Sequence, residues 1–275
     1  MSDMVRAIVL GIIEGLTEFL PVSSTGHLIL AMPCLGIDEA QPPWPVFLYF
    51  IQTGAILAVV IYFWRRLWRQ IFTRPTAGWG SHLIAKLLVA MIPAGVVGLL
   101  LDRIMEEYLE KPIPVVVALI VGAGVMVVIE RRCSRPKPMK IEDVSLRQAL
   151  LVGLAQCVSV IPGTSRAMAT IMGGILFGMS PAVAAEFSFY LAIPTLCGAG
   201  LLRIVKHRAE ITSQSAAVLG LGFWVSFVVA LLVVAAFMRY IQTRKLWPFA
   251  VYRVLLGLVV LGWWLWGNSV GGGGH

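Results

Sequence analysis

The sequence predicts an all-α integral membrane protein in which six transmembrane helices and two re-entrant helical hairpins form an inverted-topology repeat. The first observation is compositional: the 275 residues are 59% hydrophobic and only 13% charged, about half the charged fraction of a soluble domain. The mean hydropathy is +0.87. The second is that two apolar stretches are interrupted by polar, proline-containing elbows. The third is that basic residues gather in alternate loops.

Six apolar stretches are long enough to cross a bilayer, which takes about 20 helical residues. They are residues 46–64, 83–101, 113–130, 182–203, 216–238 and 248–266.

Two further apolar stretches, 5–35 and 146–178, are each divided into two short arms by a polar elbow. The first elbow contains Pro21 and the second contains Pro162. Each arm is too short to cross a membrane, which favours a re-entrant hairpin over two ordinary spans. Aligned on their prolines, FLPVSS (19–24) and VIPGTS (160–165) resemble each other, which indicates an inverted repeat with a polar site near the midplane.

The loop charges predict the orientation, because surplus Lys and Arg mark the cytoplasmic side. Residues 28–45 contain no Lys or Arg, whereas 131–147 contain six. The basic loops follow the first, third and fifth spans, with Arg65, Arg66, Arg69, Arg74, Arg131, Arg132, Arg135, Lys137, Lys140, Arg147, Arg239, Arg244 and Lys245. The first hairpin is therefore expected to enter from outside and the second from inside.

We expect one polytopic membrane domain over residues 1–270, with repeat 1 at about 1–130 and repeat 2 at about 146–268. The start of the chain does not have the pattern of a cleavable signal peptide, and the glycine-rich 271–275 is treated as an appended tail. The four cysteines contain no CxxC pair, so no zinc site or disulfide framework is predicted. The net charge of +8 fits cytoplasmic loops, and nucleic-acid binding is excluded.

Two carboxylates lie beside the first elbow. Glu14 and Glu18 are four residues apart, so a helix places them on one face. An intramembrane carboxylate is costly and is therefore a functional candidate, and such a pair can bind Mg²⁺ or Ca²⁺. A shallow hairpin with both glutamates in water is the alternative.

The first elbow also carries three consecutive hydroxyls, Ser23, Ser24 and Thr25, followed by Gly26 and His27. These hydroxyls can cap the second arm, but three exceed what one cap needs. A serine near a histidine is also a nucleophile–base arrangement. Both interpretations stay open on spacing alone.

The second elbow has the composition of an anion site. Gly163 permits a turn, and Thr164 and Ser165 can begin a helix whose free N–H groups bind an anion. Arg166 can bind phosphate oxygens with two parallel hydrogen bonds, although a role as counter-ion to a glutamate is the alternative. Thr170 follows one turn later.

A third carboxylate, Glu186, lies within a predicted span, where it is expected to complete the polar site or to pair with Arg166. Together the elbows offer metal-binding carboxylates, a nucleophile with a base, and an anion clamp. That set suits phosphoanhydride hydrolysis, in which positioning and charge neutralisation dominate.

At this point the chain resembles a known family, the bacterial undecaprenyl-diphosphate phosphatases of the bacitracin-resistance protein type. The motifs are EGLTEFLPVSSTGH (14–27), IQTGAILAVV (51–60), PGTSR (162–166), EFSFYLAIP (186–194) and PFAVYR (248–253). The resemblance covers nearly the whole chain. It implies hydrolysis of undecaprenyl diphosphate to undecaprenyl phosphate and orthophosphate in the bacterial inner membrane, which recycles the cell-wall lipid carrier and confers bacitracin resistance.

The resemblance also implies residue roles. Glu14 and Glu18 match the family's catalytic, metal-linked glutamates, Ser24 the proposed nucleophile, and His27 the proposed base or alternative nucleophile. Arg166 and Thr170 match residues of the diphosphate-binding motif. We take Ser23, Thr25, Gly163, Thr164 and Ser165 as further substrate-binding candidates. One departure is Ala167-Met168, where the family has Ser-Gly, and pocket width or lipid preference is expected to differ.

The expected cofactor is Mg²⁺ or Ca²⁺, and the expected partners are a polyprenyl diphosphate lipid and the membrane, with a homodimer left open. A site opening to the outer face is expected. The alternative is a transporter that moves polyprenyl phosphate without hydrolysis, because fold does not decide function.

Overall fold

Helices account for every regular element that the computed structural model contains across residues 1–72, 78, 81–104, 108–109, 111–133, 139–206 and 211–271. The α-helices are α1 (Asp3–Thr17), α2 (Ser24–Cys34), α3 (Trp44–Tyr62), α4 (Trp64–Phe72), α5 (Leu83–Ile104), α6 (Pro112–Arg132), α7 (Leu146–Gln156), α8 (Arg166–Leu176), α9 (Pro181–Lys206), α10 (Ser213–Thr243) and α11 (Trp247–Gly271). Two short 3-10 helices are η3 (Ile141–Asp143) and η4 (Cys157–Val160). Arg74, Arg135, Lys137 and residues 272–275 lie outside the described residues.

Within the described residues, six helices are long and apolar enough to cross a membrane, which confirms the predicted number of spans. These segments are Trp44–Tyr62, Leu83–Leu101, Pro112–Arg132, Pro181–Gly198, Ser215–Thr243 and Trp247–Trp266. The chain is therefore a multi-pass membrane protein. The first predicted span ended too late, because the helix breaks at Phe63 and resumes as α4.

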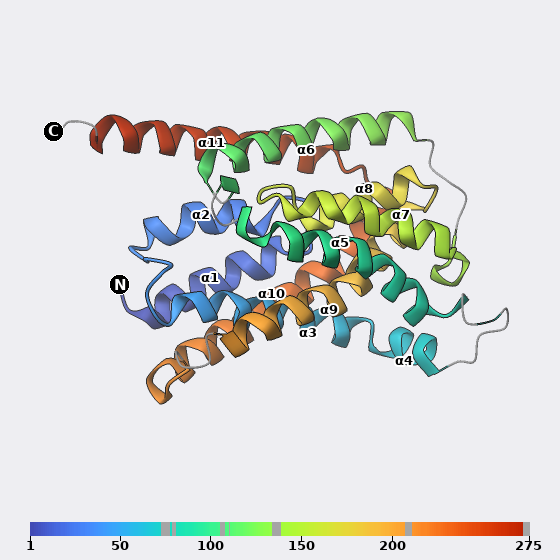
Figure 1. Cartoon of the computed structure of the whole chain (residues 1–275), viewed down its shortest axis with the longest axis horizontal. Coiled ribbons are helices and arrows are strands. Elements are labelled where there is room, and N and C mark those ends of the chain that lie inside the picture. The colour runs from blue at the N-terminus through green and yellow to red at the C-terminus, as the bar shows by residue number, and fades with distance from the viewer. Residues whose placement is uncertain are drawn as a thin grey trace.

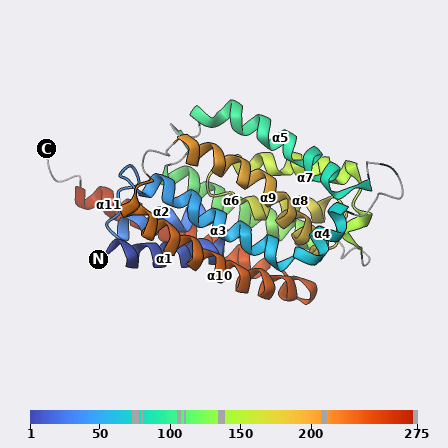
Figure 2. The same ribbon diagram turned by 90° about the horizontal axis from the view of Figure 1, so that it is seen from below.

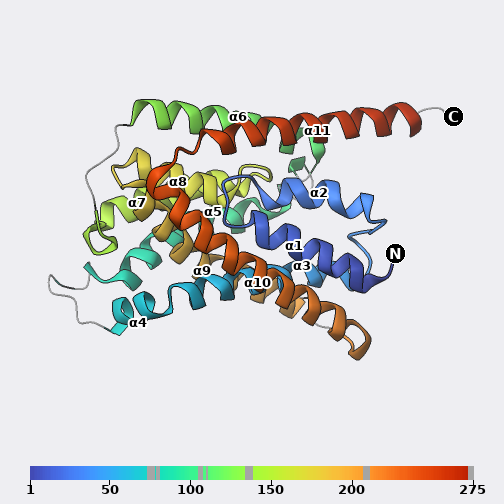
Figure 3. The same ribbon diagram turned by 180° about the vertical axis from the view of Figure 1, so that it is seen from behind.

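The two interrupted stretches form helical hairpins that approach each other from opposite ends of the molecule. Figure 1 shows α1 running inward from the end that carries both termini and α2 returning to it, while α7 and α8 do the same from the opposite end. Figure 3 shows the same arrangement from behind. Both elbows therefore lie in the middle of the helix bundle.

The two elbows match when they are aligned on the N-cap residues of α2 and α8 rather than on their prolines. Ser23 is the N-cap of α2 and Ser165 the N-cap of α8. Ser23 Oγ accepts from the Gly26 N–H at 3.3 Å and Ser165 Oγ from the Met168 N–H at 3.2 Å. This pairing differs by one residue from the proline alignment, which placed Ser24 opposite Ser165. Ser24 instead corresponds to Arg166, since each is the first residue of its helix.

Close helix contacts hold the first hairpin in place. Figure 2 shows α1, α3 and α10 side by side, and these three helices contact one another along their lengths. A methyl group at Gly15 would lie 2.8 Å from both the Ser226 carbonyl oxygen and Val229 Cβ. Only glycine permits this approach of α1 to α10, as small residues do in membrane helix interfaces generally. On the opposite face α6 and α11 pack together along the top of Figure 1.

Candidate active site

Strained backbone at both elbows positions the polar side chains. Ser23 has a φ of 74° and Ser165 a φ of 72°, a left-handed conformation that is uncommon for residues other than glycine. Such strain persists only where surrounding contacts fix it, and it concentrates at functional sites. Ser165 Oγ also lies 3.5 Å from the Leu20 carbonyl oxygen, which links the second elbow to the first.

Glu18 joins residues from both hairpins. Its Oε2 accepts a hydrogen bond from Ser24 Oγ at 2.8 Å. Its Oε1 accepts from the Arg166 guanidinium at 3.4 Å, in an ion pair whose side chains are only 10% and 6% exposed. The structure therefore brings the predicted glutamate, hydroxyl and arginine into one cluster, although they lie as far as 148 residues apart in the chain.

The side chain of Arg166 contacts Glu18, Ser188 and Phe19 and still has one unused hydrogen-bond donor among the described residues. Its Nη1 donates to the Ser188 carbonyl oxygen at 3.0 Å, and its guanidinium lies 5.6 Å from the centre of the Phe19 ring, within the range of a cation–π contact. Thr170 Oγ1 donates to the Arg166 carbonyl oxygen at 2.8 Å and also lies 2.6 Å from Ser188 Oγ. Within the described part of the chain, the buried Arg166 Nε has no hydrogen-bond partner, so it is an unused donor at the site.

Glu14 lies one helical turn before Glu18 and is only 2% exposed. Among the residues that the structure describes, no donor is recorded for its carboxylate, an unusual state for a buried charge. No three His, Cys, Asp or Glu side chains of the described ranges come together as a metal site. A cation would therefore use the two glutamates alone, with the remaining oxygens from water or a ligand, a donor set typical of Mg²⁺.

Ser24 and His27, the candidate nucleophile and base, have different hydrogen-bond partners. Ser24 donates to Glu18, while His27 Nδ1 lies 2.7 Å from the Ser23 carbonyl oxygen and Nε2 lies 2.6 Å from the Tyr252 hydroxyl. A carbonyl can only accept, so Nδ1 carries the proton and neutral His27 accepts from Tyr252 through Nε2. The two rings stack with centroids 5.6 Å apart.

The other predicted substrate-binding residues differ in their access. Thr25 is exposed beside Ser24, whereas Thr164 is buried. Ser23 and Ser165 act as the caps described above. Gly163 has a φ of 90°, and a Cβ there would lie 2.6 Å from the Val115 carbonyl oxygen, so this turn requires glycine.

The prediction for Glu186 was wrong. Glu186 does not pair with Arg166; its Oε2 accepts from Arg66 at 3.1 Å and its Oε1 accepts from the Tyr190 hydroxyl at 2.7 Å. The helical spacing of α9 explains the difference, because residue 186 lies about half a turn from Ser188, the residue that contacts Arg166.

Sequence reasoning missed Arg253, which is 0% exposed. Its guanidinium donates to the carbonyl oxygens of Pro21 at 3.4 Å and Gly163 at 3.1 Å, one in each elbow. It also donates to the Leu119 and Ala118 carbonyl oxygens at 3.2 and 3.0 Å. An arginine inside a predicted span was the signal that could have identified it, since intramembrane charges mark functional positions.

An apolar groove of about 610 Å³ adjoins the second elbow. It runs between α6 and the α7–α8 hairpin and is lined by Val117, Val121 and Leu176, among other apolar side chains. Thr164 and Met168 line its elbow end. Met168, one of the two residues that depart from the family pattern, therefore borders the groove.

Fold and site together define an all-helical multi-pass membrane protein with a buried carboxylate, hydroxyl and arginine cluster between two helical hairpins. The family model described as "Bacitracin resistance protein BacA" matches residues 7–259. An undecaprenyl-diphosphatase of Novosphingobium aromaticivorans is 45% identical over 271 residues, covering 96% of this chain and 98% of the relative.

Two further relatives give the same result. An undecaprenyl-diphosphatase of Polaromonas naphthalenivorans is 44% identical, covering 94% of both chains. Undecaprenyl-diphosphatase 1 of Chromobacterium violaceum is 42% identical, covering 94% of this chain and 96% of the relative. The chain belongs to the bacitracin resistance protein BacA family.

Proposed function

We propose that this protein hydrolyses undecaprenyl diphosphate to undecaprenyl phosphate and orthophosphate, which returns the lipid carrier to cell-wall synthesis and confers bacitracin resistance. Glu18 carries this proposal, because it connects the Ser24 hydroxyl and the Arg166 guanidinium across the two hairpins. A nucleophile, an acceptor for its proton and a phosphate-binding cation thus occupy one buried site.

In the bacterial inner membrane, the two hairpins are re-entrant segments of an inverted repeat. Their opposed entry and their matching serine caps support this arrangement. Basic side chains at the ends of α4, α6 and α10 support a cytoplasmic position for that end of the molecule. The α1–α2 hairpin then enters from outside, and the site opens to the outer face past the exposed Thr25.

In the first chemical step, Ser24 Oγ attacks the terminal phosphorus and its proton passes to Glu18 Oε2. The bond from that phosphorus to the bridging oxygen breaks, and undecaprenyl phosphate leaves with the electron pair. Arg166 offers its free Nε and its charge to the terminal phosphoryl oxygens, which stabilises the charge that develops there.

In the second step, water attacks the phosphorus of the resulting phosphoserine. The Ser24 Oγ–phosphorus bond breaks, Glu18 returns the proton to Oγ, and orthophosphate is released. His27 takes the proton of the attacking water through Nε2 once this water has replaced the Tyr252 hydroxyl as the hydrogen-bond partner of that nitrogen. His27 therefore acts as the base of this step rather than as a partner of Ser24.

A divalent cation fits the remaining carboxylate. Glu14, which is buried, and the unused lone pairs of Glu18 would hold Mg²⁺. A bound cation supplies charge neutralisation for the diphosphate.

The groove beside the second elbow accommodates the first isoprene units of the lipid. Its lining is almost entirely apolar, and Met168 stands at the elbow end. The bulk of Met168, where the family has glycine, narrows this entrance and shifts lipid preference.

Phosphate release from undecaprenyl diphosphate by the purified protein in detergent tests the proposal. Release with Mg²⁺ present is the expected result. Retention of intact diphosphate, together with lipid movement in reconstituted vesicles, would favour the transporter alternative.

A further inference from the structure

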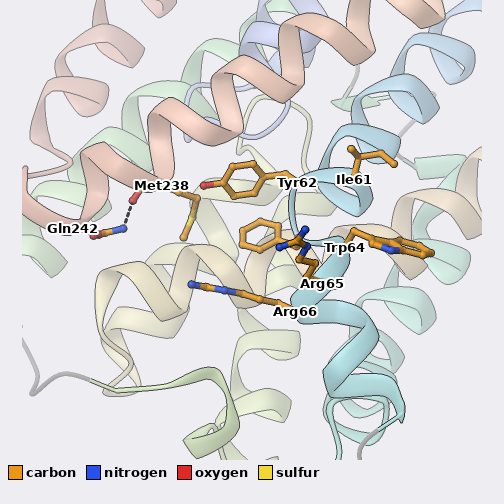
Figure 4. Close-up of a pocket in the computed structure, with 8 residues that line it drawn as sticks. Ile61, Tyr62, Trp64, Arg65, Arg66, Met238 and Gln242 are labelled. Atoms are coloured by element: carbon orange, nitrogen blue, oxygen red, sulfur yellow. Dashed lines mark hydrogen bonds between the residues drawn. The ribbon is translucent and has the colours of Figure 1, made fainter.

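A second cavity lies at the opposite end of the protein from both termini, where α3 breaks at Phe63 and α4 begins. Its volume is about 740 Å³, within the usual range for small-molecule sites. Figure 4 shows Tyr62 and Arg66 extending from the α3–α4 junction toward α10, which contributes Met238 and Gln242.

The charge of this cavity is positive. Arg65 and Arg66 both line it, and Arg65 is exposed with no ion pair or hydrogen bond recorded among the described residues. Among the residues that the structure describes, Glu186 is the only carboxylate in contact with either arginine, and it binds Arg66 at 3.1 Å. Arg239 and Arg244 near the end of α10 add further positive charge to this end of the molecule. A ligand here is therefore an anion.

The aromatic side chains of α4 place the cavity at a membrane–water interface. Trp64, Trp68 and Phe72 form a ladder with ring centroids 5.5 and 4.3 Å apart. They are 51%, 53% and 65% exposed. Aromatic rings at this density on one side of an arginine-rich helix are typical of a segment lying in the headgroup layer.

The cavity lining combines the two environments that a lipid headgroup needs. Arg65, Arg66 and the Tyr62 hydroxyl offer donors for phosphate oxygens. Ile61 and Trp64, both exposed, offer apolar surface for the beginning of the hydrocarbon chains. A volume of 740 Å³ greatly exceeds what inorganic phosphate occupies.

We propose that this cavity binds the phosphate headgroup of an anionic membrane lipid, separately from the substrate site. The lipid lies in the leaflet next to α4, and its phosphate contacts Arg65 and Arg66. Arg66 is already paired with Glu186, so Arg65 provides most of the preference for an anionic headgroup over a zwitterionic one.

Native mass spectrometry of the purified full-length protein tests this proposal. The protein is titrated with dioleoyl phosphatidylglycerol or with dioleoyl phosphatidylcholine, which have the same chains. Wild type is expected to retain phosphatidylglycerol preferentially, and Arg65→Gln to weaken that binding on the order of tenfold. Arg147→Gln is the matched control, because Arg147 is an exposed arginine outside the cavity.

Two soluble competitors distinguish a lipid site from a free phosphate site. Glycerol 3-phosphate and inorganic phosphate, each at the lipid concentration, are expected not to displace phosphatidylglycerol. Equal retention of the two lipids, unchanged lipid binding in Arg65→Gln, or displacement by inorganic phosphate would each overturn the proposal. Lipid retention is measured without turnover, so its outcome does not depend on the hydrolysis proposed above.

Discussion

Replacing Arg253 by Met should slow hydrolysis by loosening the two elbows relative to each other. Arg253 donates to one carbonyl of each elbow, at Pro21 and Gly163. A hydrogen bond to a charged group contributes about 1.5 kcal/mol or more, so the two bonds together contribute about 3 kcal/mol. If that energy fixes the transition-state geometry, kcat falls about a hundredfold. KM should change less, because the proposed mechanism has Arg166 and the cation bind the diphosphate.

The assay is steady-state phosphate release, with thermal unfolding in detergent measured on the same samples. Arg253→Lys keeps the charge but loses the planar set of donors, so its kcat should lie between those of wild type and Arg253→Met. Arg239→Met, at an exposed position, is the matched control. A folded Arg253→Met protein with wild-type kcat would refute the reasoning. Should Arg253→Met fail to fold, wild-type kcat in Arg253→Lys would do so.

Three other perturbations test the site and the orientation. EDTA should abolish phosphate release and Mg²⁺ should restore it, since Glu14 and Glu18 are buried acceptors for a cation. Full activity after thorough metal removal would show that hydrolysis needs no cation. Arg166→Lys should reduce kcat/KM tenfold or more through loss of the free Nε and the paired donors, and unchanged kinetics would argue against phosphate binding there. In intact cells, in single-cysteine variants, an impermeant thiol reagent should label the exposed Cys34 and spare Cys133; the opposite pattern would reverse the topology.

Hydropathy and loop composition were enough to predict an all-helical protein with six spans. Six spans and two elbows follow from where apolar runs are long and where proline and hydroxyls interrupt them. These are local properties of the chain. Which residue of one elbow corresponds to which residue of the other is not a local property. It depends on which serine caps each helix, and the caps are Ser23 and Ser165, whereas the proline alignment paired Ser24 with Ser165.

The site was predicted in its residue types more reliably than in its contacts. The proximity of Ser24 to Glu18 depends on the turn between α1 and α2, and short sequence spacing favoured His27 as the partner instead. The roles of Glu186 and Arg253 depend on neighbouring helices that sequence alone does not place. Arg253 was nevertheless recognisable as a charge within a predicted span.

The most direct test of the central claim compares wild type with Ser24→Ala in phosphate release at saturating undecaprenyl diphosphate and Mg²⁺. If Ser24 attacks phosphorus and Glu18 takes its proton, kcat should fall by roughly a thousandfold or more. Lipid diphosphate binding should persist through Arg166. Thr243→Ala, on an exposed hydroxyl at the end of α10 and outside the site, should retain full activity. Wild-type turnover by Ser24→Ala would contradict the account and transfer the attack to His27 or to water.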